Sequence, residues 1–302
     1  MSEISVIGCG LMGSALVRTL AKGGSTLTIW NRTRQKAEAI VRSGAVGVTV
    51  ADSVGAALEA SPWTIFNIAN CADCLTLLEN EQHRLRGKII IELTTGTPNE
   101  ARRLGDHITT AGGRYLDGAV IGYPNLVGTP QLQILCSGDP AAFATCRSML
   151  ERLGGVLFLG ENPGAASAFD LSCIIPVAPL VVGLLQAVKI CRNEGVPLDR
   201  YEAFIKKTIP LMVTDILDKA RQEDFATNPD KIESSVSVMV AISRLIANYS
   251  RDADIDPGMF EALTRLFEAG VASGRGEHDW VCAADLHADH RPVSSSGHSE
   301  NT

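Results

Sequence analysis

The first 160 residues alternate short aliphatic runs with longer helical patterns, and this alternation limits the chain to few folds. Parallel strands need a crossover connection, which is usually a helix, so alternation is typical of a parallel sheet with helices on its faces. We expect strands in eight runs, at 4–8, 27–31, 46–50, 64–69, 88–93, 113–120, 131–138 and 156–160. The pattern predicts an α/β domain with a parallel, doubly wound sheet of Rossmann type.

Strand-like runs stop after residue 160, and long helical patterns take over. Helices are expected over 165–194, 201–221, 231–251 and 257–273, with start signals at Asp199 and Asp256 and a stop at Gly195. This change predicts a second, all-helical domain. The expected organisation is therefore a dinucleotide-binding domain over 1–162, a helical domain over 163–286 and a polar, disordered tail over 287–302.

Charge and cysteine usage narrow the class of protein. The net charge is −7 and the lysines and arginines form no cluster, so we expect no nucleic-acid partner. Eight cysteines are scattered through a chain with no recognisable secretory signal, which indicates reduced thiols and a cytoplasmic location. A lone Cys71-x-x-Cys74 pair is weak evidence for redox chemistry, and we interpret both as core residues. The tail histidines His287, His290 and His298 are expected to be solvated, so no metal site is predicted.

The apolar stretch that follows Asp170 raises the question of a membrane. Pro176 and Pro179 interrupt it, and Gln186 and Lys189 end it. We interpret it as too short and too broken to span a bilayer, and as buried in protein.

The strongest motif of the chain follows the first expected strand. Gly8-Cys9-Gly10-Leu11-Met12-Gly13 fits the G-x-G-x-x-G pattern between a strand and a helix, where it indicates dinucleotide binding. Gly8 permits the tight turn, Gly10 lets the backbone approach a pyrophosphate, and Gly13 allows helix and strand to pack closely. The N–H groups of Leu11 and Met12 open the helix and would face the phosphates.

The end of the second expected strand favours NADPH over NADH. An NAD site usually has an acidic residue here for the ribose 2′-hydroxyl, but this chain has the neutral Asn31. Arg32, Thr33 and Lys36 supply positive charge and hydrogen-bond donors, which suit a 2′-phosphate. The alternative is that these cations only solvate the start of a helix.

With these motifs, the sequence resembles the β-hydroxyacid dehydrogenase superfamily and, within it, most closely the NADPH-dependent imine reductases. The superfamily likeness comes from GCGLMGSALV (8–17), the Asn-Arg-Thr turn (31–33) and the plan of two domains joined by a long inter-domain helix. The narrower likeness comes from four stretches, at 93–104, 116–138, 166–172 and 274–280. The resemblance implies reduction of cyclic imines or iminium ions to amines.

Three departures separate this chain from the hydroxyacid dehydrogenases. Ile121 stands where their substrate-binding serine would be, and Ile174 replaces an expected asparagine. Asp170 occupies the slot of their catalytic lysine. A carboxylate would repel an alkoxide or an anionic substrate, but it would attract the cationic iminium that accepts a hydride.

The resemblance makes Asp170 the candidate catalytic residue, as proton donor to the nitrogen or as stabiliser of the iminium. A proton donor near neutral pH needs a raised pKa, and an apolar helix face would raise it. The neighbours three and four positions away, Ala166, Ser167, Cys173 and Ile174, form such a small, weakly polar face. The alternative is an aspartate buried against an arginine for structural reasons.

The remaining candidates are positioned by strand ends and by the resemblance. Thr95 and Asn70 follow expected strands and should lie at the edge where the cofactor crosses. Tyr123 and Asn125 are substrate-side candidates. Ile121 is a further pocket candidate. Because the family builds its pocket across a domain-exchanged homodimer, the resemblance adds the candidates Met212, Asp215, Met239 and Trp280, although core packing is the preferred interpretation for the two methionines.

Two other functions stay open from the sequence. One is a β-hydroxyacid or other carbonyl dehydrogenase of the same superfamily with an unusual site. The other is a nucleotide-binding protein that has lost its catalysis.

Overall fold

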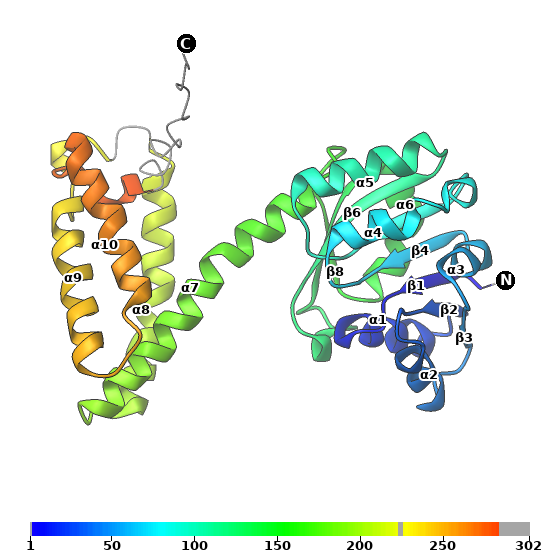
Figure 1. Ribbon diagram of the computed structural model, residues 1–302, viewed down its shortest axis with the longest axis horizontal. Helices are drawn as coiled ribbons and strands as arrows, with labels where there is room; N and C mark the ends of the chain where they lie inside the picture. Colours follow the sequence, from blue (N-terminus) through cyan, green and yellow to red (C-terminus); the bar gives the residue numbers. More distant parts are fainter. Residues whose placement is uncertain (1, 223–225, 284–302) are drawn as a thin grey trace, which may run out of the picture. The chain divides into compact units, whose positions relative to one another are not determined.

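The computed structural model describes residues 2–222 and 226–283 of the chain. Its contacts divide it into two compact units, Met1–Pro179 and Leu180–Thr302, and helix α7 (Ala165–Asn193) belongs to both (Figure 1). The domain boundary expected at residue 162 stays a prediction. The expected tail with His287, His290 and His298 lies outside the described residues.

The first unit contains an eight-stranded sheet in the order β3-β2-β1-β4-β5-β6-β7-β8. The strands are β1 (Ile4–Ile7), β2 (Leu27–Trp30), β3 (Val48–Val50), β4 (Trp63–Phe66), β5 (Ile89–Glu92), β6 (Arg114–Ile121), β7 (Gln133–Gly138) and β8 (Gly155–Phe158). Each of the eight expected runs overlaps a strand, and the predicted Rossmann-type fold is confirmed. The chain order reverses between β1 and β4, which is the point where doubly wound sheets bind nucleotides.

One pair of strands departs from the predicted parallel arrangement, because β6 and β7 run antiparallel. The segment between them, residues 122–132, contains a single 3-10 turn, η2 (Pro124–Leu126), instead of a crossover helix. Without a crossover the chain can only turn back along its neighbour. The chain then crosses over through helix α6 (Pro140–Glu151), and β8 pairs with β7 in parallel.

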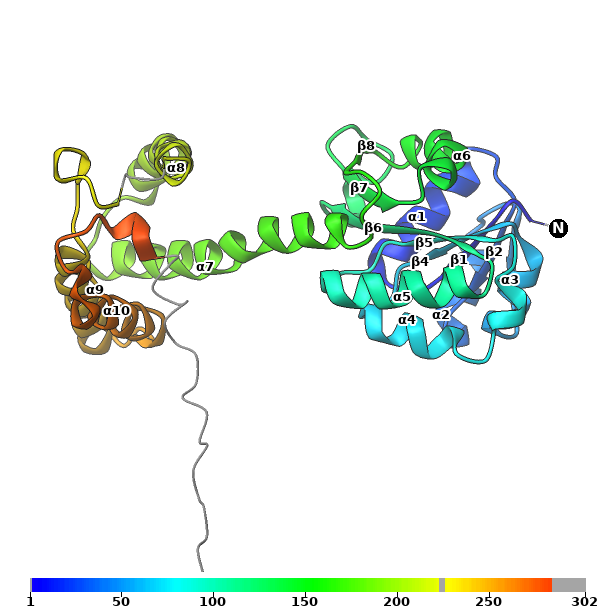
Figure 2. The same ribbon diagram turned by 90° about the horizontal axis from the view of Figure 1, so that it is seen from above.

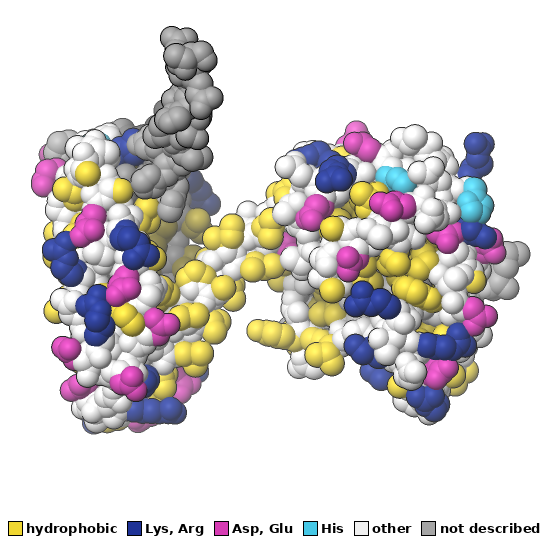
Figure 3. Space-filling model, in the orientation of Figure 1, with side chains coloured by type: hydrophobic (Ala, Val, Ile, Leu, Met, Phe, Trp, Pro, Cys, Tyr) yellow, Lys and Arg dark blue, Asp and Glu magenta, His cyan; other side chains and the backbone are white. Residues whose placement is uncertain are grey.

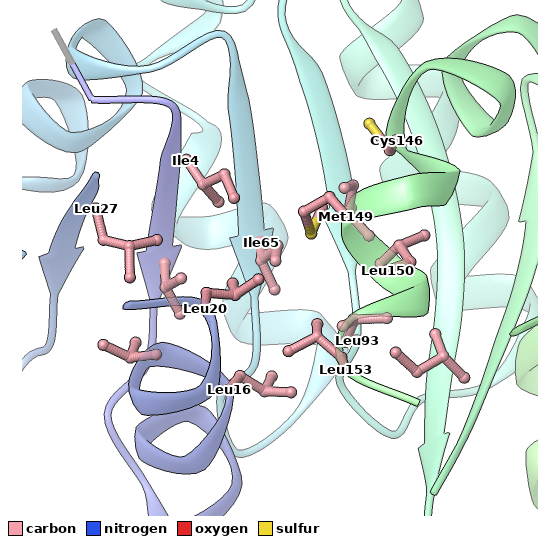
Figure 4. Close-up of a cluster of buried hydrophobic side chains, with 14 of the residues drawn as sticks. Ile4, Leu16, Leu20, Leu27, Ile65, Leu93, Cys146, Met149, Leu150 and Leu153 are labelled. Carbon is pink, nitrogen blue, oxygen red and sulfur yellow. The ribbon is translucent and has the colours of Figure 1, made fainter. Parts of the chain in front are cut away.

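Helices cover both faces of the sheet and bury its side chains. They are α1 (Leu11–Lys22), α2 (Arg34–Arg42), α3 (Val54–Ala60), α4 (Cys71–Leu78), α5 (Pro98–Thr110) and α6 (Pro140–Glu151). One core joins α1 and α6 to the sheet through residues such as Leu16, Leu20, Met149 and Leu150 (Figure 4). The opposite core includes Leu104 and is made with α3, α4 and α5, and Figure 2 shows α4 and α5 on the side of the sheet away from α6.

The second unit is helical, as predicted, and contains α8 (Leu198–Ala220), α9 (Val236–Asp252) and α10 (Gly258–Gly270). The expected start of the third helix at residue 231 is wrong. The chain makes a 3-10 turn there, η3 (Pro229–Lys231), and α9 begins after Ser235, whose side chain accepts the N–H of Val238. The small core of the helical unit joins Val236, Phe267 and Cys282, so this unit buries little apolar surface by itself.

Helix α7 corrects the expectation for the apolar stretch after Asp170. The helix continues through Pro176 and Pro179, so the prediction that the segment is too short and too broken is wrong. By length and composition it is the one helix of the described chain that could cross a membrane. The most apolar stretch of this helix is also not buried by the described residues of the chain (Figure 3). Its exposed apolar side chains are Phe169, Ile174, Ile175, Val177, Leu180, Val181, Val182 and Leu185.

Candidate active site

A cavity of about 490 Å³ lies at the carboxyl ends of β1, β2 and β4, where the strand order reverses. Three segments meet there, namely the glycine turn before α1, the turn before α2 and the connection from β4 into α4. Its lining consists of Gly8, Gly10, Leu11, Met12, Trp30, Asn31, Arg32, Thr33, Lys36, Asn67, Ile68, Ala69, Asp73, Thr76 and Leu77. Eight of the eleven predicted cofactor residues are in this lining.

The glycine turn leaves room for a ligand. Gly8 has a φ of +110°, and a Cβ there would meet the backbone oxygen of Asn67 at 2.0 Å. A Cβ on Gly10 would meet nothing within 4 Å, so the space beside its backbone is open. No side chain caps the N-terminus of α1, and such a terminus is suited to binding phosphate. Gly13 is outside the lining and serves packing, because a Cβ there would meet the Gly8 oxygen at 2.2 Å.

Asn31 joins the glycine turn to the end of β2. Its Oδ1 accepts the N–H of Cys9 at 2.9 Å, and its Nδ2 donates to the Thr33 carbonyl at 2.9 Å. Both ends of the amide are therefore used. A carboxylate could accept the first bond but could not donate the second, so the neutral side chain is built into this corner of the cavity.

Two of the nearby cations remain available to an anion. Arg34 is engaged by Glu38 at 2.9 Å and by Asp52 at 2.7 Å. Arg32 and Lys36 line the cavity and make no ion pair with any residue that the structure describes. This corner can therefore receive a 2′-phosphate, in agreement with the sequence prediction.

Asn67 is a lining residue that the sequence analysis missed. It directly follows β4, whereas the predicted Asn70 caps α4, where its Oδ1 accepts the N–H of Asp73 at 2.9 Å. Asn70 follows the expected run 64–69, whereas Asn67 lies inside it, and the signal for Asn67 was its position at the end of the actual strand next to β1. Because β4 ends at Phe66, Asn67 and not Asn70 lies at the strand end and lines the cavity.

A chain of contacts leads from the cavity to Asp170. The Nδ2 of Asn67 donates to the Leu93 carbonyl at 2.6 Å, and the Ile68 N–H donates to Thr94 Oγ1 at 3.1 Å. The next residue, Thr95, is not in the cavity lining, but its side chain lies close enough to Asp170 to lower the pKa of that carboxyl group. The end of β5 therefore connects the nucleotide cavity to the candidate catalytic carboxyl group.

Asp170 lies in the second turn of α7 and is 3% exposed. Burial raises the pKa of its carboxyl group, the side chain of Thr95 lowers it, and the nearby charge of Asp117 raises it further. The net shift is upward, as expected for a carboxyl group on a weakly polar helix face. No arginine or lysine forms an ion pair with Asp170 in the described part of the chain, which argues against the purely structural alternative.

The neighbours of Asp170 match the predicted face in part. Ala166 and Ser167 are buried, whereas Ile174 is exposed and Cys173 is half-buried. The small residues therefore pack toward the sheet, and the face further along the helix stays open.

The predicted substrate-side residues are spread over both units. Ile121 is half-buried at the end of β6, and Tyr123 and Asn125 lie on the exposed turn after it. Met239 packs against the small core of the helical unit, in agreement with core packing for this methionine. Trp280 packs against the same core. On α8, Met212 is exposed and Asp215 pairs with Lys219 at 2.8 Å. A role for these residues in the pocket stays a prediction.

Cys71 and Cys74 lie on α4, and their side chains point into the core between this helix and the sheet. Both side chains are buried, and burial raises the pKa of both thiols. A redox cysteine needs an accessible thiolate, so this environment supports the structural interpretation.

Comparison with known protein families gives a match to each part of the chain. Residues 3–160 match the NAD binding domain of 6-phosphogluconate dehydrogenase, and residues 162–288 match the C-terminal domain of NADPH-dependent reductive aminase-like proteins. The matches follow the two-part organisation and cover nearly all of the chain.

Whole-chain comparisons agree with the family matches. The sequence is 28% identical over 284 residues to the NADPH-dependent reductive aminase of Aspergillus oryzae, covering 92% of this chain and 94% of the relative. The fold is similar to an imine reductase from Myxococcus stipitatus in complex with NADP+, with a TM-score of 0.83, 31% identity and coverage of 94% and 99% of the two chains. It is also similar to a reductive aminase from Aspergillus terreus in complex with NADPH4, cyclohexanone and allyl amine, with a TM-score of 0.82, 30% identity and coverage of 95% and 99%.

Proposed function

Because the chain belongs to the family of imine reductases and reductive aminases, we propose that it reduces carbon–nitrogen double bonds with NADPH. The observation that carries this proposal is the buried Asp170, which has no cationic partner among the described residues and is linked through Thr95 to the nucleotide cavity. A hydroxyacid dehydrogenase would need a cation at this place. The proposed substrate is a cyclic imine or iminium without a carboxylate.

The cavity fits NADPH through residues of this chain. The open backbone at Gly10 and the uncapped start of α1 would hold the pyrophosphate. Arg32, Thr33 and Lys36 would hold the 2′-phosphate. When bound, NADPH supplies the hydride that the substrate carbon accepts.

Asp170 would act on the substrate nitrogen in one of two ways. As a general acid it holds a proton on its carboxyl group and gives it to the nitrogen, which a raised pKa favours near neutral pH. As an ionised group it stabilises the positive charge of the iminium in a site with little water. Thr95 lies beside the carboxyl group in both cases.

The direct test is an NADPH-oxidation assay of the whole protein with three substrate classes. We expect turnover of cyclic imines such as a pyrroline, weaker or no turnover of simple ketones, and none of 2- or 3-hydroxyacids with NADP+. Turnover of hydroxyacids without imine reduction would instead support the carbonyl dehydrogenase. NADPH binding without turnover of any class would support a protein that has lost its chemistry.

We also propose that the protein is a homodimer, because a single chain leaves two apolar helix surfaces uncovered. One is the exposed side of α7, and the other lies on α8 and contains Phe204, Leu211, Met212, Val213 and Leu217. Exposed apolar surface of this extent marks an interface. In a domain-exchanged dimer the helical domain of one copy would cover the nucleotide domain of the other, and a second copy would cover α7 without a membrane.

A charge on this surface is expected to separate the subunits. Leu211 is 71% exposed in the single chain, so Leu211→Glu should leave the fold intact but place a carboxylate in the interface. We expect the dimer mass measured by light scattering to become that of a monomer, with loss of imine reduction. Val46→Glu is the matched control, because Val46 is 84% exposed on the connection between α2 and β3. A wild-type protein that is monomeric and active would contradict the dimer.

A further inference from the structure

The carboxylate of Asp117 binds the first turn of α7, and the chemistry described above does not use it. Asp117 lies on β6 and is completely buried. Its Oδ2 accepts the N–H groups of Gly164 at 2.9 Å and Ser167 at 3.0 Å, and its Oδ1 accepts the Ser167 hydroxyl at 2.6 Å. A strand residue therefore caps the helix that carries Asp170.

Ser137 of β7 completes this cap. Its hydroxyl donates to Asp117 Oδ2 at 3.0 Å and accepts the N–H of Ala166 at 3.0 Å. The remaining N–H, of Ala165, donates to the carbonyl of Asn162 at 3.1 Å. All the N–H groups that a helix start normally leaves unpaired thus have acceptors here. The first turn cannot rotate or slide without breaking several buried hydrogen bonds.

Asp170 lies on α7 one turn after this cap. Ser167 and Asp170 are three residues apart, so they lie on the same face of α7. A rotation of the first turn would carry the Asp170 carboxyl group away from Thr95 and from the end of β5. The cap on one side and Thr95 on the other therefore define the position of the candidate catalytic group.

Several buried titratable groups surround Asp117. Glu92 of β5 pairs in register with Asp117, and burial together with the Asp117 charge raises the pKa of Glu92 to about 8. Burial and the same charge raise the pKa values of Tyr115 on β6, Cys71 on α4 and Cys136 on β7. These neighbours are neutral near pH 7, whereas the donors of α7 and Ser137 suit an ionised Asp117.

We propose that Asp117 is a positioning residue for the reduction, because it fixes the first turn of α7 and thereby the place at which Asp170 meets the substrate nitrogen. The inference rests on the proposed function of Asp170. The charge of Asp117 has a second effect, since it disfavours ionisation of Asp170. The position and the proton affinity of the Asp170 carboxyl group thus depend on a fully buried residue outside the cavity lining.

Asp117→Asn in the whole protein tests the proposal, because it keeps the shape of the side chain and removes its charge. The amide cannot accept at both of its ends, so the cap weakens, and we expect kcat to fall on the order of tenfold to a hundredfold. The NADPH dissociation constant should not change. Loss of the nearby negative charge should move the limb of the pH profile that reports Asp170 to lower pH, by about 0.5–1 unit.

Asp139→Asn is the matched control. Asp139 caps α6 by accepting the N–H groups of Ala141 at 2.8 Å and Ala142 at 2.9 Å, but α6 carries no candidate site residue. We expect lower stability with an unchanged pH profile. A wild-type kcat and pH profile in Asp117→Asn, or an equal shift in both variants, would overturn the proposal.

Ser167→Ala covers the case in which Asp117→Asn does not fold. It keeps the carboxylate and both backbone bonds and removes the donor at 2.6 Å. A lower kcat at unchanged NADPH affinity supports the positioning role, and a wild-type kcat overturns it. Failure of the proposed function is separately visible, because the wild-type protein would then not reduce C=N substrates at all.

Discussion

Replacing Asp170 by alanine should lower kcat/KM for imine reduction by about 10²–10⁴-fold, the range that a positioned acid or base contributes. NADPH affinity, measured by fluorescence titration, should stay near the wild-type value, because Asp170 is not part of the cavity lining. The carboxyl group is buried and lies beside Thr95, so the substitution removes a group held in one place. Equal turnover in the two proteins would exclude the role assigned to Asp170.

The pH profile of the wild-type protein distinguishes the two roles of this carboxyl group. Burial, together with the charge of Asp117, raises the pKa of Asp170. If the protonated form donates to the nitrogen, kcat/KM falls as pH rises through that pKa. If the ionised form stabilises the iminium, kcat/KM falls as pH decreases through it. Asp170→Asn keeps the size of the side chain and should abolish the corresponding limb in either case.

The double substitution Arg32→Ala with Lys36→Ala should remove most of the preference for NADPH over NADH. Each hydrogen bond to a charged group contributes about 1.5–3 kcal/mol, so loss of both side chains should reduce the ratio of kcat/KM values by about 100-fold or more. NADH turnover should change little, because NADH has no 2′-phosphate for these cations to bind. The measurement is steady-state kinetics with both cofactors.

Arg34→Ala is the control for this change. Arg34 belongs to the same turn and carries the same charge, but Glu38 and Asp52 already engage it. Its loss should leave the cofactor ratio near wild type. If Arg34→Ala lowers the ratio as much as the double variant does, a diffuse positive field holds the phosphate, and the assignment to Arg32 and Lys36 is incorrect.

The strands could be predicted because a doubly wound sheet is buried on both faces. Runs such as 89–91 are apolar throughout, and that signal does not depend on which strand is the neighbour. The direction of β7 was not predictable in the same way. It depends on whether residues 122–132 cross over or turn back, and their turn residues are compatible with both.

The prediction that the prolines of α7 break the helix was wrong because their effect depends on their spacing along the helix. A proline removes one backbone hydrogen bond, which usually ends or bends a helix. Pro176 and Pro179 are three positions apart, so both missing bonds lie on one side of α7, and the helix continues.

The cavity residues that belong to the dinucleotide motif could be predicted from the sequence. Those whose position depends on the exact end of a strand could be predicted less well. Gly8, Gly10 and the turn at Asn31 follow from the dinucleotide pattern, and all three line the cavity. Asn67 was missed because an apolar run does not show at which residue its strand ends. The cap on α7 was equally hidden, because Asp117 and Gly164 are far apart in the sequence and meet only in the folded sheet.

The two hydrogen bonds of Asn31 have a consequence for how cofactor preference can evolve. An acidic residue at this position would favour NADH and could still accept the N–H of Cys9, but it would remove the bond to the Thr33 carbonyl and weaken the turn before α2 that lines the cavity. Arg32 and Lys36 carry no such structural duty in the described chain. Substitutions that shift the cofactor preference toward NADH are therefore expected first at Arg32 and Lys36. A change at Asn31 is expected only after other contacts stabilise the turn.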